Sequence, residues 1–586
     1  MQEVKMNRKV QKISAVLCAS VMILTGCSQV QFNVNEQSST KEEADEQHIY
    51  EIEKKTVTVH ESWDDEPDEI ELVFLDGVTD VPYVSVESFK DLFGSMMASP
   101  QSPDLALTME EDGECVTLKR ESGYPVKIAF DENYIYFWDL DAFFRMTEDV
   151  VLMDNLDSMY FDEDGGLRYL EVTDSFERYG RDVTVDAGHY GIDLVHQDDG
   201  YYIPLQLVSD VFFSPYGVGI IYNGSDVYFG VGGNFADFKD LFYNKDYPEK
   251  RSPELAEFNY NELCLALDFI YGLKDQHDIT EFNTMFMQTG LMDKMHSEDR
   301  SEACQALYES INVYLDDLHS GFLKNIYVKN DVITNKNPRS AMIAERDEER
   351  HKEARAEYYG EDVPGYEEVG NTAYISFDEF TYQAVDYYNE KAEDHLDDTM
   401  GLAIYSFEQI TRKDSPIENV VLDMSVNHGG VVFAAAYIIG MFIGDGSLSV
   451  RNATSDALVT QNFKADLNLD RKFDDSDTLL GKYNLICLTS PVSFSCGNLV
   501  PSVLKNSHEV ITMGQTSGGG ACIVHYLTTA DGSIMQLSGQ RQMSYTKNGS
   551  FYEIDRGVEP DYIISVPEQF YDREALTKRI NEILGM

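Results

Sequence analysis

Basic residues are scarce in this chain of 586 residues, which has 45 Lys and Arg against 104 Asp and Glu and a formal net charge of −59. A chain of this charge repels phosphates, so no nucleic-acid partner is expected. An anionic membrane surface would not attract the chain by charge either. Because the acidic residues are spread over the whole sequence, we interpret them as a solvated surface. Hydrophobic residues make up 43% of the chain, which indicates a folded protein of several domains.

Cysteines are few and scattered. The chain contains eight, and those that follow the N-terminal segment show no short paired spacing. Neither a zinc site nor a disulfide framework is therefore expected, and most of these thiols are interpreted as small buried hydrophobic groups. No cofactor is required by this composition.

Long apolar runs are also missing, apart from one near the N-terminus. Basic residues lead into the apolar stretch Ile13–Leu24, which is shorter than the roughly 20 residues of a membrane span. It ends in Leu24-Thr-Gly-Cys27, which resembles the bacterial lipobox, whose cysteine carries the lipid of the mature protein. We predict a signal peptide over residues 1–26, lipidation of Cys27 and an exported protein anchored to the cell membrane. A plain secretory cleavage site is the alternative.

The remaining sequence divides into parts of different pattern. Polar residues predict a flexible tether, short strands predict a mostly-β module, helical spacing predicts a helical segment, a charge-rich stretch predicts a helix or linker, and alternating strands and helices predict an α/β domain. The boundaries are 27–49 for the tether, 50–248 for the β module, 249–330 for the helical segment, 331–368 for the charged linker and 369–586 for the α/β core.

The β module contains a weak internal repeat. Residues Val81–Phe93 and Tyr202–Phe213 each run from a strand through a proline into an amphipathic helix. The module resembles the stalk-like domains at the N-terminus of copper amine oxidases. No metal or catalytic cluster stands out in it, so we interpret it as a spacer or a binding module, with the cell wall as an expected contact.

A serine-rich segment, Ser490-Pro-Val-Ser-Phe-Ser-Cys-Gly-Asn498, lies between an apolar run that predicts a buried strand and a predicted helix. A serine at such a turn exposes its hydroxyl beside backbone N–H groups, as acyl-transfer chemistry needs. A helix N-cap is the alternative role for this serine.

Four further segments accompany it in a fixed order. They are Leu315-Asp-Asp-Leu-His-Ser-Gly-Phe322, Val420-Val-Leu-Asp-Met-Ser-Val-Asn-His-Gly-Gly430, Met513-Gly-Gln-Thr-Ser-Gly-Gly-Gly-Ala521 and Tyr552-Glu-Ile-Asp-Arg-Gly-Val-Glu-Pro-Asp561. With them the chain resembles the tail-specific, or C-terminal-processing, serine peptidases, especially their tricorn-core-like branch, over roughly residues 255–580. The resemblance implies an α/β peptidase core of the ClpP/crotonase-like kind, preceded by a helical segment and, here, by the mostly-β stalk-like module.

The resemblance also implies roles for individual residues. His319 stands where the branch has its general base, and Ser495 where the family has its nucleophile, with Ser493 as the fallback. Glu553 is the nearest match to the glutamate that orients the active-site side chains, and Asp555 is its rival. The oxyanion would be held by backbone N–H groups of Cys496 and of Gly429 or Gly430. His428 and His525 are competing bases, although neither lies in a matching motif.

The chain departs from the family pattern at several places. Ser425 replaces the usual arginine, and Gly497-Asn498 replaces the Ser-Glu pair after the nucleophile. Gly520 stands where the Ser–Lys branch has a lysine, and no lysine occurs between Lys505 and Lys547, so a histidine base is required. Residues 323–367 are too short and too charged for the PDZ domain that many members carry.

One acidic segment resembles a dockerin-type calcium loop. Oxygen-bearing side chains fall at positions 1, 3, 5, 9 and 12, although an arginine replaces the glycine of the sharp turn. Structural calcium and a plain acidic surface loop remain the two interpretations. The ligands would be Asp466, Asn468, Asp470, Asp474 and Asp477.

The sequence as a whole predicts a membrane-tethered serine endopeptidase that acts on peptides or proteins through an acyl-enzyme. Two other functions are consistent with the same residues. One is a catalytically inactive peptide- or ligand-binding lipoprotein on the same fold, because fold alone does not fix activity. The other is a cell-wall scaffold whose function resides in residues 50–248.

Overall fold

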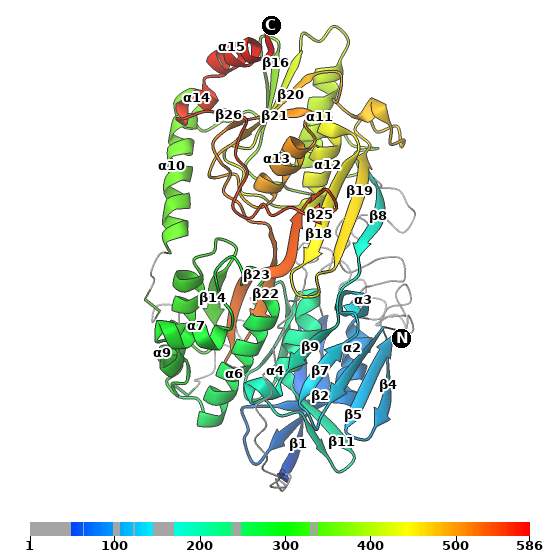
Figure 1. Ribbon diagram of the computed structural model, residues 1–586, viewed down its shortest axis with the longest axis vertical. Coiled ribbons are helices and arrows are strands. Elements are labelled where there is room, and N and C mark those ends of the chain that lie inside the picture. Colours follow the sequence, from blue (N-terminus) through cyan, green and yellow to red (C-terminus); the bar gives the residue numbers. More distant parts are fainter. Residues whose placement is uncertain are drawn as a thin grey trace.

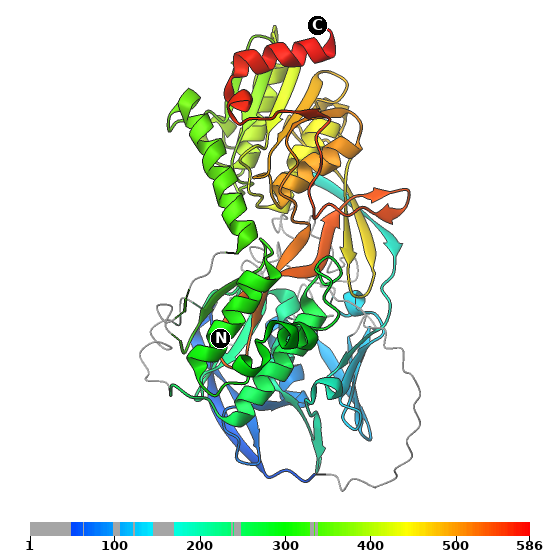
Figure 2. The same cartoon turned by 60° about the vertical axis from the view of Figure 1, so that its left-hand side comes forward.

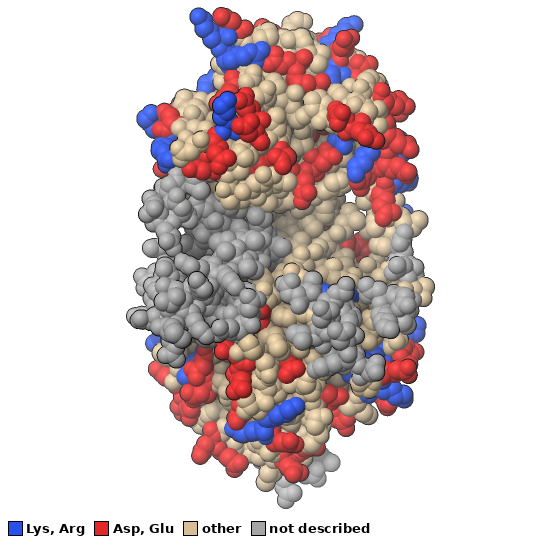
Figure 3. All heavy atoms as spheres, turned by 180° about the vertical axis from the view of Figure 1, so that it is seen from behind, with Lys and Arg blue, Asp and Glu red and all other residues tan. Residues whose placement is uncertain are grey.

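The computed structural model describes residues 48–62, 64–97, 106–120, 124–144, 169–235, 238, 248–328, 333–334 and 338–586. The predicted signal peptide and Cys27 lie outside these residues. No helix in the described ranges is long and apolar enough to cross a membrane. Acidic side chains are spread over the face seen in Figure 3, and basic ones are fewer, as the composition predicts.

The C-terminal half is built on a six-stranded sheet in the order β15-β16-β17-β20-β21-β26. Its central strands are parallel and fully buried apolar runs, with Val420 opposite Leu485 and Leu485 opposite Val510, as a sheet covered on both faces requires. The strands are β15 Tyr366–Val369, β16 Thr372–Ser376, β17 Asn419–Asp423, β20 Asn484–Thr489, β21 Val510–Gly514 and β26 Tyr562–Ile563.

Helices cover both faces of this sheet. One face packs on α11 Thr399–Thr411, α12 Val432–Ile443 and α13 Cys496–Asn506. The other packs on α10 Arg339–Tyr359, α14 Glu568–Tyr571 and α15 Arg573–Leu584. This confirms the predicted α/β pattern, and Figure 1 shows this half at the top of the molecule.

The pattern of alternating strands and helices in the core predicts a helix over about residues 383–412, but the first half of this range is not α-helical. Tyr388 N–H donates to the Asp386 carboxylate and Asn389 N–H to the Asp386 carbonyl, so the chain makes a turn there. Such local side-chain bonds compete with helix formation. The helix α11 begins at Thr399, after Asp398 has accepted the N–H of Gln383.

The N-terminal half contains two sheets that share one apolar core with the helical segment. The seven-stranded sheet has β10 Val195–Gln197, β11 Gly200–Pro204, β3 Tyr83–Ser85, β2 Asp64–Leu75, β1 Ile52–Glu61, β13 Val227–Val231 and β12 Val218–Tyr222, in that order. The five-stranded sheet has β4 Leu107–Asp112, β5 Cys115–Arg120, β6 Pro125–Ala129, β7 Tyr134–Phe137 and β9 Val183–Asp186. The main helices are α2 Val86–Met97, α6 Pro253–Ile270, α7 Phe282–Thr289 and α9 Arg300–Glu309.

The two copies of the internal repeat are neighbours in the first of these sheets. Strands β3 and β11 pair antiparallel, with Ile203 opposite Val84. Each strand leads into a helix, and the aromatic side chains of the two helices meet, with the rings of Phe89 and Phe212 4.6 Å apart. The repeat is therefore a real structural duplication.

The module 50–248 is joined to the C-terminal half by strand pairing. Its strand β8 Leu170–Arg178 pairs antiparallel with β19 Leu458–Ala465 of the C-terminal half, with Phe463 opposite Val172. These strands belong to a third sheet that also contains β14 Gly321–Asn325, β18 Gly446–Asn452, β22 Cys522–Thr528 and β23 Ser533–Ser544. The boundary predicted from sequence patterning does not reveal such pairing, because the partners are almost 300 residues apart.

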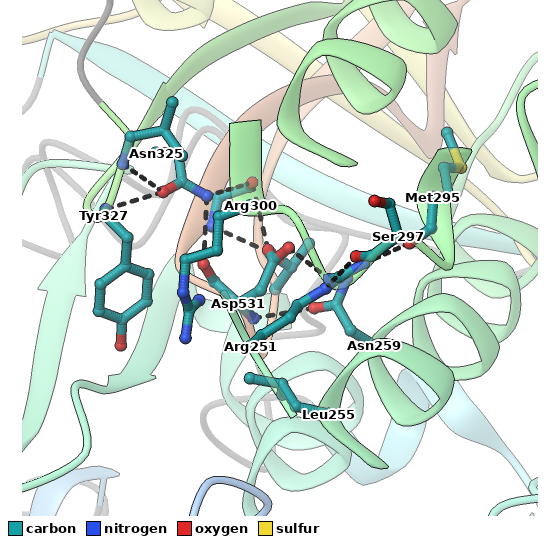
Figure 4. Close-up of polar contacts among 12 residues, drawn as sticks. Arg251, Leu255, Asn259, Met295, Ser297, Arg300, Asn325, Tyr327 and Asp531 are labelled. Carbon is teal, nitrogen blue, oxygen red and sulfur yellow. Dashed lines mark hydrogen bonds and ion pairs between the residues drawn. The ribbon is translucent and has the colours of Figure 1, made fainter. Parts of the chain in front are cut away.

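The β22–β23 hairpin descends from the C-terminal half and is anchored at its turn in the other half (Figure 1). Arg251 Nη1 donates to Asp531 Oδ2 at 2.7 Å, and Asn259 Oδ1 accepts the Asp531 N–H at 2.8 Å. Asn325 Nδ2 donates to the carbonyl of the same residue. Figure 4 shows these groups converging on the turn from three elements, so the hairpin holds the two halves together.

Candidate active site

Ser495 is the residue at which strand β20 and its exit loop turn into helix α13. Its backbone has φ 56° and ψ −124°, a left-handed conformation that a residue with a side chain rarely adopts. The Ser495 N–H donates to the Gly519 carbonyl at 2.9 Å, which holds the turn. The Ser495 side chain makes no capping hydrogen bond, although the residue occupies the N-cap position. The hydroxyl is thus not used as a helix cap.

Ser493 has a structural role instead. Its side chain is fully buried, its hydroxyl donates to the Met424 carbonyl at 2.7 Å, and its oxygen accepts the Ser490 N–H at 2.9 Å. Both hydrogen bonds fix the loop in front of Ser495. The fallback assignment of Ser493 as nucleophile is not supported by this geometry.

Two unused N–H groups lie beside Ser495. Within the described part of the chain, the N–H groups of Gly430 and Cys496 have no hydrogen-bond acceptor. The Gly429 N–H, which the sequence offers as an alternative donor to the oxyanion, is not free. It already donates to Asn427 Oδ1 at 2.9 Å. Gly429 is needed for space: a Cβ there would lie 2.6 Å from Ser495 Cβ and 3.0 Å from Cys496 N.

His319 approaches the same loop from the other half of the molecule. It follows a short π-helix, η7 Ser310–Leu315, and precedes β14. Its N–H donates to Asp317 Oδ1 at 3.0 Å, its ring lies 4.5 Å from the Phe494 ring, and its Cε1 is 3.1 Å from where a Cβ on Gly520 would be. His319 therefore lies against the two loops that flank Ser495, and a lysine at Gly520 would not fit there.

The environment keeps the His319 ring neutral. Burial lowers the pKa of His319, and the nearby carboxylates of Asp317 and Asp555 oppose that shift without cancelling it. Its Nδ1 is buried without a hydrogen-bond partner. Among the described residues no hydrogen bond joins His319 to Ser495, a separation that is common in unliganded catalytic sites.

Asp555, and not Glu553, is the carboxylate next to His319. Burial raises the pKa of Asp555, and the hydrogen bond from the Ala521 N–H opposes the shift. Asp555 Oδ1 accepts the Ala521 N–H at 3.0 Å, and its carbonyl accepts the Gly520 N–H at 3.1 Å. The Glu553 carboxylate contacts Arg451 Nη2 at 3.0 Å and is 45% exposed. These contacts favour Asp555 over Glu553 as the carboxylate beside His319.

A cavity of about 470 Å³ opens at Ser495. Its wall includes Gly430, Cys496 and Gly520, and most other lining side chains are apolar. The apolar ones are Val431, Val432, Leu499, Ala521, Ile523, Val524 and Met543. The cavity can therefore hold a chain segment against the hydroxyl and the two free N–H groups.

The competing histidines lie elsewhere. His428 Nε2 is 3.4 Å from Glu348 on helix α10. His525 is buried 3.1 Å from the Ser214 hydroxyl in the N-terminal half, and burial lowers its pKa to about 3. Neither is placed to act on Ser495.

The acidic loop 466–477 is held by its own hydrogen bonds. Asp466 accepts the N–H groups of Asp470 and Arg471, and Asp477 accepts those of Leu467 and Asn468. No group of three or more His, Cys, Asp or Glu side chains in the described ranges is arranged to hold a metal ion. The predicted calcium site, which also used Asp474, has no support in this arrangement.

Residues 371–564 match the model of peptidase family S41. A search of curated proteins found no match.

Three solved structures align at low identity. A lipoprotein from Streptococcus agalactiae is 13% identical, with 57% of this chain and 98% of that chain covered and a TM-score of 0.34. A putative peptidase from Parabacteroides merdae ATCC 43184 is 16% identical, with 57% and 97% covered and a TM-score of 0.39. The tricorn protease is 10% identical, with 82% and 46% covered and a TM-score of 0.31. The part of the chain that contains Ser495, Gly430 and Asp555 is, by the family match, similar to peptidase family S41.

Proposed function

We propose that the protein is a serine endopeptidase in which Ser495 attacks the carbonyl carbon of a peptide bond. The observation that carries the proposal is the Ser495 turn. The Ser495 backbone is left-handed, and its hydroxyl makes no capping hydrogen bond to the helix. The residue lines a cavity together with Gly430 and Cys496, whose N–H groups are unused. A helix cap would have satisfied the hydroxyl, so this arrangement is typical of a nucleophile.

Each neighbouring group has a step in this reaction. His319, neutral because of its burial, accepts the Ser495 proton as the Oγ–carbon bond forms. The N–H groups of Cys496 and Gly430 hold the resulting oxyanion. His319 then gives the proton to the leaving amine, and water releases the acyl group from Ser495 by the same route. Asp555 stabilises the transient imidazolium.

The nucleophile is tested with a matched pair of variants, Ser495→Ala and Ser493→Ala, on residues 28–586. Ser495→Ala should lower the rate of casein cleavage by at least about 10³-fold and abolish labelling by a fluorophosphonate. Ser493→Ala should keep the labelling but lose stability by about 1–3 kcal/mol, because it leaves the buried Ser490 N–H unpaired and removes one of the two hydrogen bonds to the Met424 carbonyl. Loss of labelling in Ser493→Ala alone would reverse the assignment.

An inert wild-type protein would favour the second function. If the folded wild type neither cleaves casein nor reacts with the probe, while a control protease works in the same buffer, the chain is a binding protein on this fold. The departures at Gly497 and Asn498 from the family pattern are the observation behind this alternative. The Asn498 side chain is already bonded to Ile554 and Ser517.

Export and lipid anchoring are part of the same proposal and rest on the Leu-Thr-Gly-Cys27 motif. Radiolabelled fatty acid should enter the wild-type protein when it is expressed in a bacterium. A Cys27→Ser variant should remain unlabelled and appear in the soluble fraction. Equal labelling of both proteins would remove the anchor from the proposal and leave the peptidase assignment untouched.

A further inference from the structure

The proposed base and nucleophile come from different halves of the molecule. His319 lies between η7 and β14, whereas Ser495 and Gly430 lie on loops of the six-stranded sheet. The distance between them depends on the elements that bridge the halves. One is the β22–β23 hairpin. The other is α10, which runs along one side of the molecule from one half to the other in both Figure 1 and Figure 2.

The N-terminal end of α10 is fastened to the loop that carries His319. The Ser340 N–H and hydroxyl both donate to Asp316 Oδ1, at 2.9 and 2.7 Å. Asp316 ends the π-helix with φ 49°. The next residue, Asp317, accepts the His319 N–H at 3.0 Å and the Ser320 hydroxyl at 2.6 Å. A shift of this end of α10 would therefore move His319.

The other end is fastened to the loop that holds Gly430. Arg355 donates from both terminal nitrogens to the two oxygens of Asp378, at 2.6 and 2.7 Å. Phe380, two residues on, donates its N–H to the Gly429 carbonyl at 2.7 Å and accepts the Val431 N–H at 2.8 Å. A bidentate pair fixes direction as well as distance, so Arg355 sets the loop from which the Gly430 N–H projects.

Other polar contacts of α10 lie toward the same half of the molecule as Arg355: Glu348 is 3.4 Å from His428 Nε2, and the Tyr359 hydroxyl donates to Glu367. Of its 21 residues, His351 and Ala354 are buried, and the other side chains are at least partly exposed. His351 Nδ1 is 3.0 Å from the Tyr571 hydroxyl, which anchors the middle of the helix to the core. Ser340 and Arg355 are separated by about 22 Å along the helix axis, at about 1.5 Å per residue.

From these contacts we propose that α10 is a spacer that aligns His319 with the oxyanion-binding loop, with Asp316 and Arg355 as positioning residues. The inference rests on the proposed peptidase function. A spacer works only while both of its ends are attached. Releasing either end should therefore cost as much as releasing both.

The test is a double-mutant cycle on casein cleavage with Asp316→Ala, Arg355→Met and the double variant. Each single variant should lower kcat by about 10- to 100-fold with KM little changed, because misplacement of catalytic groups acts on the chemical step. The double variant should be no slower than the slower single variant. Arg355→Lys, which keeps the charge but not the fork, should recover part of the loss.

The control is Arg350→Met on the same helix, whose side chain is 56% exposed and 3.7 Å from Asp347. It should leave kcat unchanged. Multiplicative losses in the double variant would overturn the proposal, because sites this far apart normally act independently. So would an unchanged kcat in both single variants when their thermal unfolding matches the wild type.

Hydrogen exchange separates this proposal from the peptidase assignment. Arg355→Met should speed amide exchange in residues 316–321 as well as in 427–431, and Asp316→Ala should do the same in both loops. If the wild type is inert on casein and fluorophosphonate, the peptidase proposal fails, but coupled exchange still supports the spacer. Exchange confined to the loop next to each substitution overturns the spacer.

Discussion

Ser495 has a left-handed backbone conformation, and its side chain makes no capping hydrogen bond to helix α13. Such a residue costs on the order of 1–3 kcal/mol in backbone strain. The surroundings enforce it. Gly429 has φ 102° and no room for a Cβ, and the Gly519 carbonyl accepts the Ser495 N–H. The chain holds a strained serine against a glycine turn, and that is the local condition for an exposed nucleophile.

Motif order points to Ser495, His319 and Cys496, and the structure brings these residues to one region. It could not choose between neighbouring residues. The Gly430 N–H is the available donor of the glycine pair, because the Asn427 side chain accepts the N–H of Gly429 but not that of Gly430. Asp555 is favoured over Glu553 because Glu553 contacts Arg451 and is 45% exposed, whereas Asp555 interacts electrostatically with His319, and these contacts are seen only in the structure. Nothing in the sequence pointed to Arg355 or Asp378.

The two carboxylates near the site should respond differently to neutralisation. Asp555→Asn should lower kcat by about 10²–10⁴-fold, because it removes the charge that stabilises the imidazolium. Glu553→Gln should change kcat by about fivefold or less, since an exposed ion pair contributes about 0–1 kcal/mol. Steady-state cleavage of a fluorogenic peptide measures both.

Each of these variants is isosteric, so circular dichroism and thermal unfolding should match the wild type. A large loss in Glu553→Gln together with a small one in Asp555→Asn would restore Glu553 as the orienting residue. Fluorophosphonate labelling gives a second readout, since it depends on Ser495 activation but not on substrate binding.

Strands were the most predictable elements, because buried parallel strands are short apolar runs between turn residues. The apolar stretches at residues 372–376 and 419–423 are strands β16 and β17 of the six-stranded sheet. The charge-rich stretch 331–368 is consistent with either a helix or a linker, and in the structure it contains helix α10. Its charge pattern says nothing about Asp378, so its attachment could not be predicted.

The acidic loop is a segment for which the sequence leaves two interpretations open. Its spacing of oxygen side chains resembled a calcium loop, but the same side chains satisfy backbone N–H groups when the chain turns back on itself. Arg471, at the position of the expected glycine, has φ 63° and stacks 3.7 Å from the Tyr388 ring centre. Spacing alone does not distinguish ligands from turn residues.

The β module, the helical segment and the α/β core are combined in the fold in a way that their sequence patterns do not show. All three contribute to one buried polar cluster. Asp210 comes from the β module, Glu262 from α6, and Thr528 from β22. Gln206 Nε2 donates to Asp210 and to Thr528 at 3.0 and 3.1 Å. Pairing across such sequence distances leaves no local signal.

The two carboxyl groups in this cluster share a fully buried site. Burial raises the pKa of Asp210 to about 7 and the pKa of Glu262 well above its usual value, the latter also because of the adjacent Asp210 charge. In the described part of the chain no cation pairs with either group. His525 on β22 is kept neutral by burial, with its pKa lowered to about 3, so it does not supply a charge.

The pair makes stability fall as pH rises. Below about pH 4 both the folded and the unfolded chain carry the protons. Above that pH the unfolded chain loses them while the folded chain keeps them, up to about pH 7 for Asp210. Over this interval each such proton lowers the free energy of unfolding by about 1.4 kcal/mol per pH unit. Glu262→Gln removes one titrating group and should flatten this part of the curve.

Guanidinium unfolding at pH 5, 6 and 7 checks this, read as the change in midpoint between the lowest and highest pH. The change should be smaller in Glu262→Gln than in the wild type, whereas Glu254→Gln, at the exposed start of the same helix, should behave as the wild type does. Comparing variants cancels the titration of the many surface acids. If both variants parallel the wild type, the pair is ionised in the folded protein, and a water or cation must accompany it into the interface where the three parts of the chain meet.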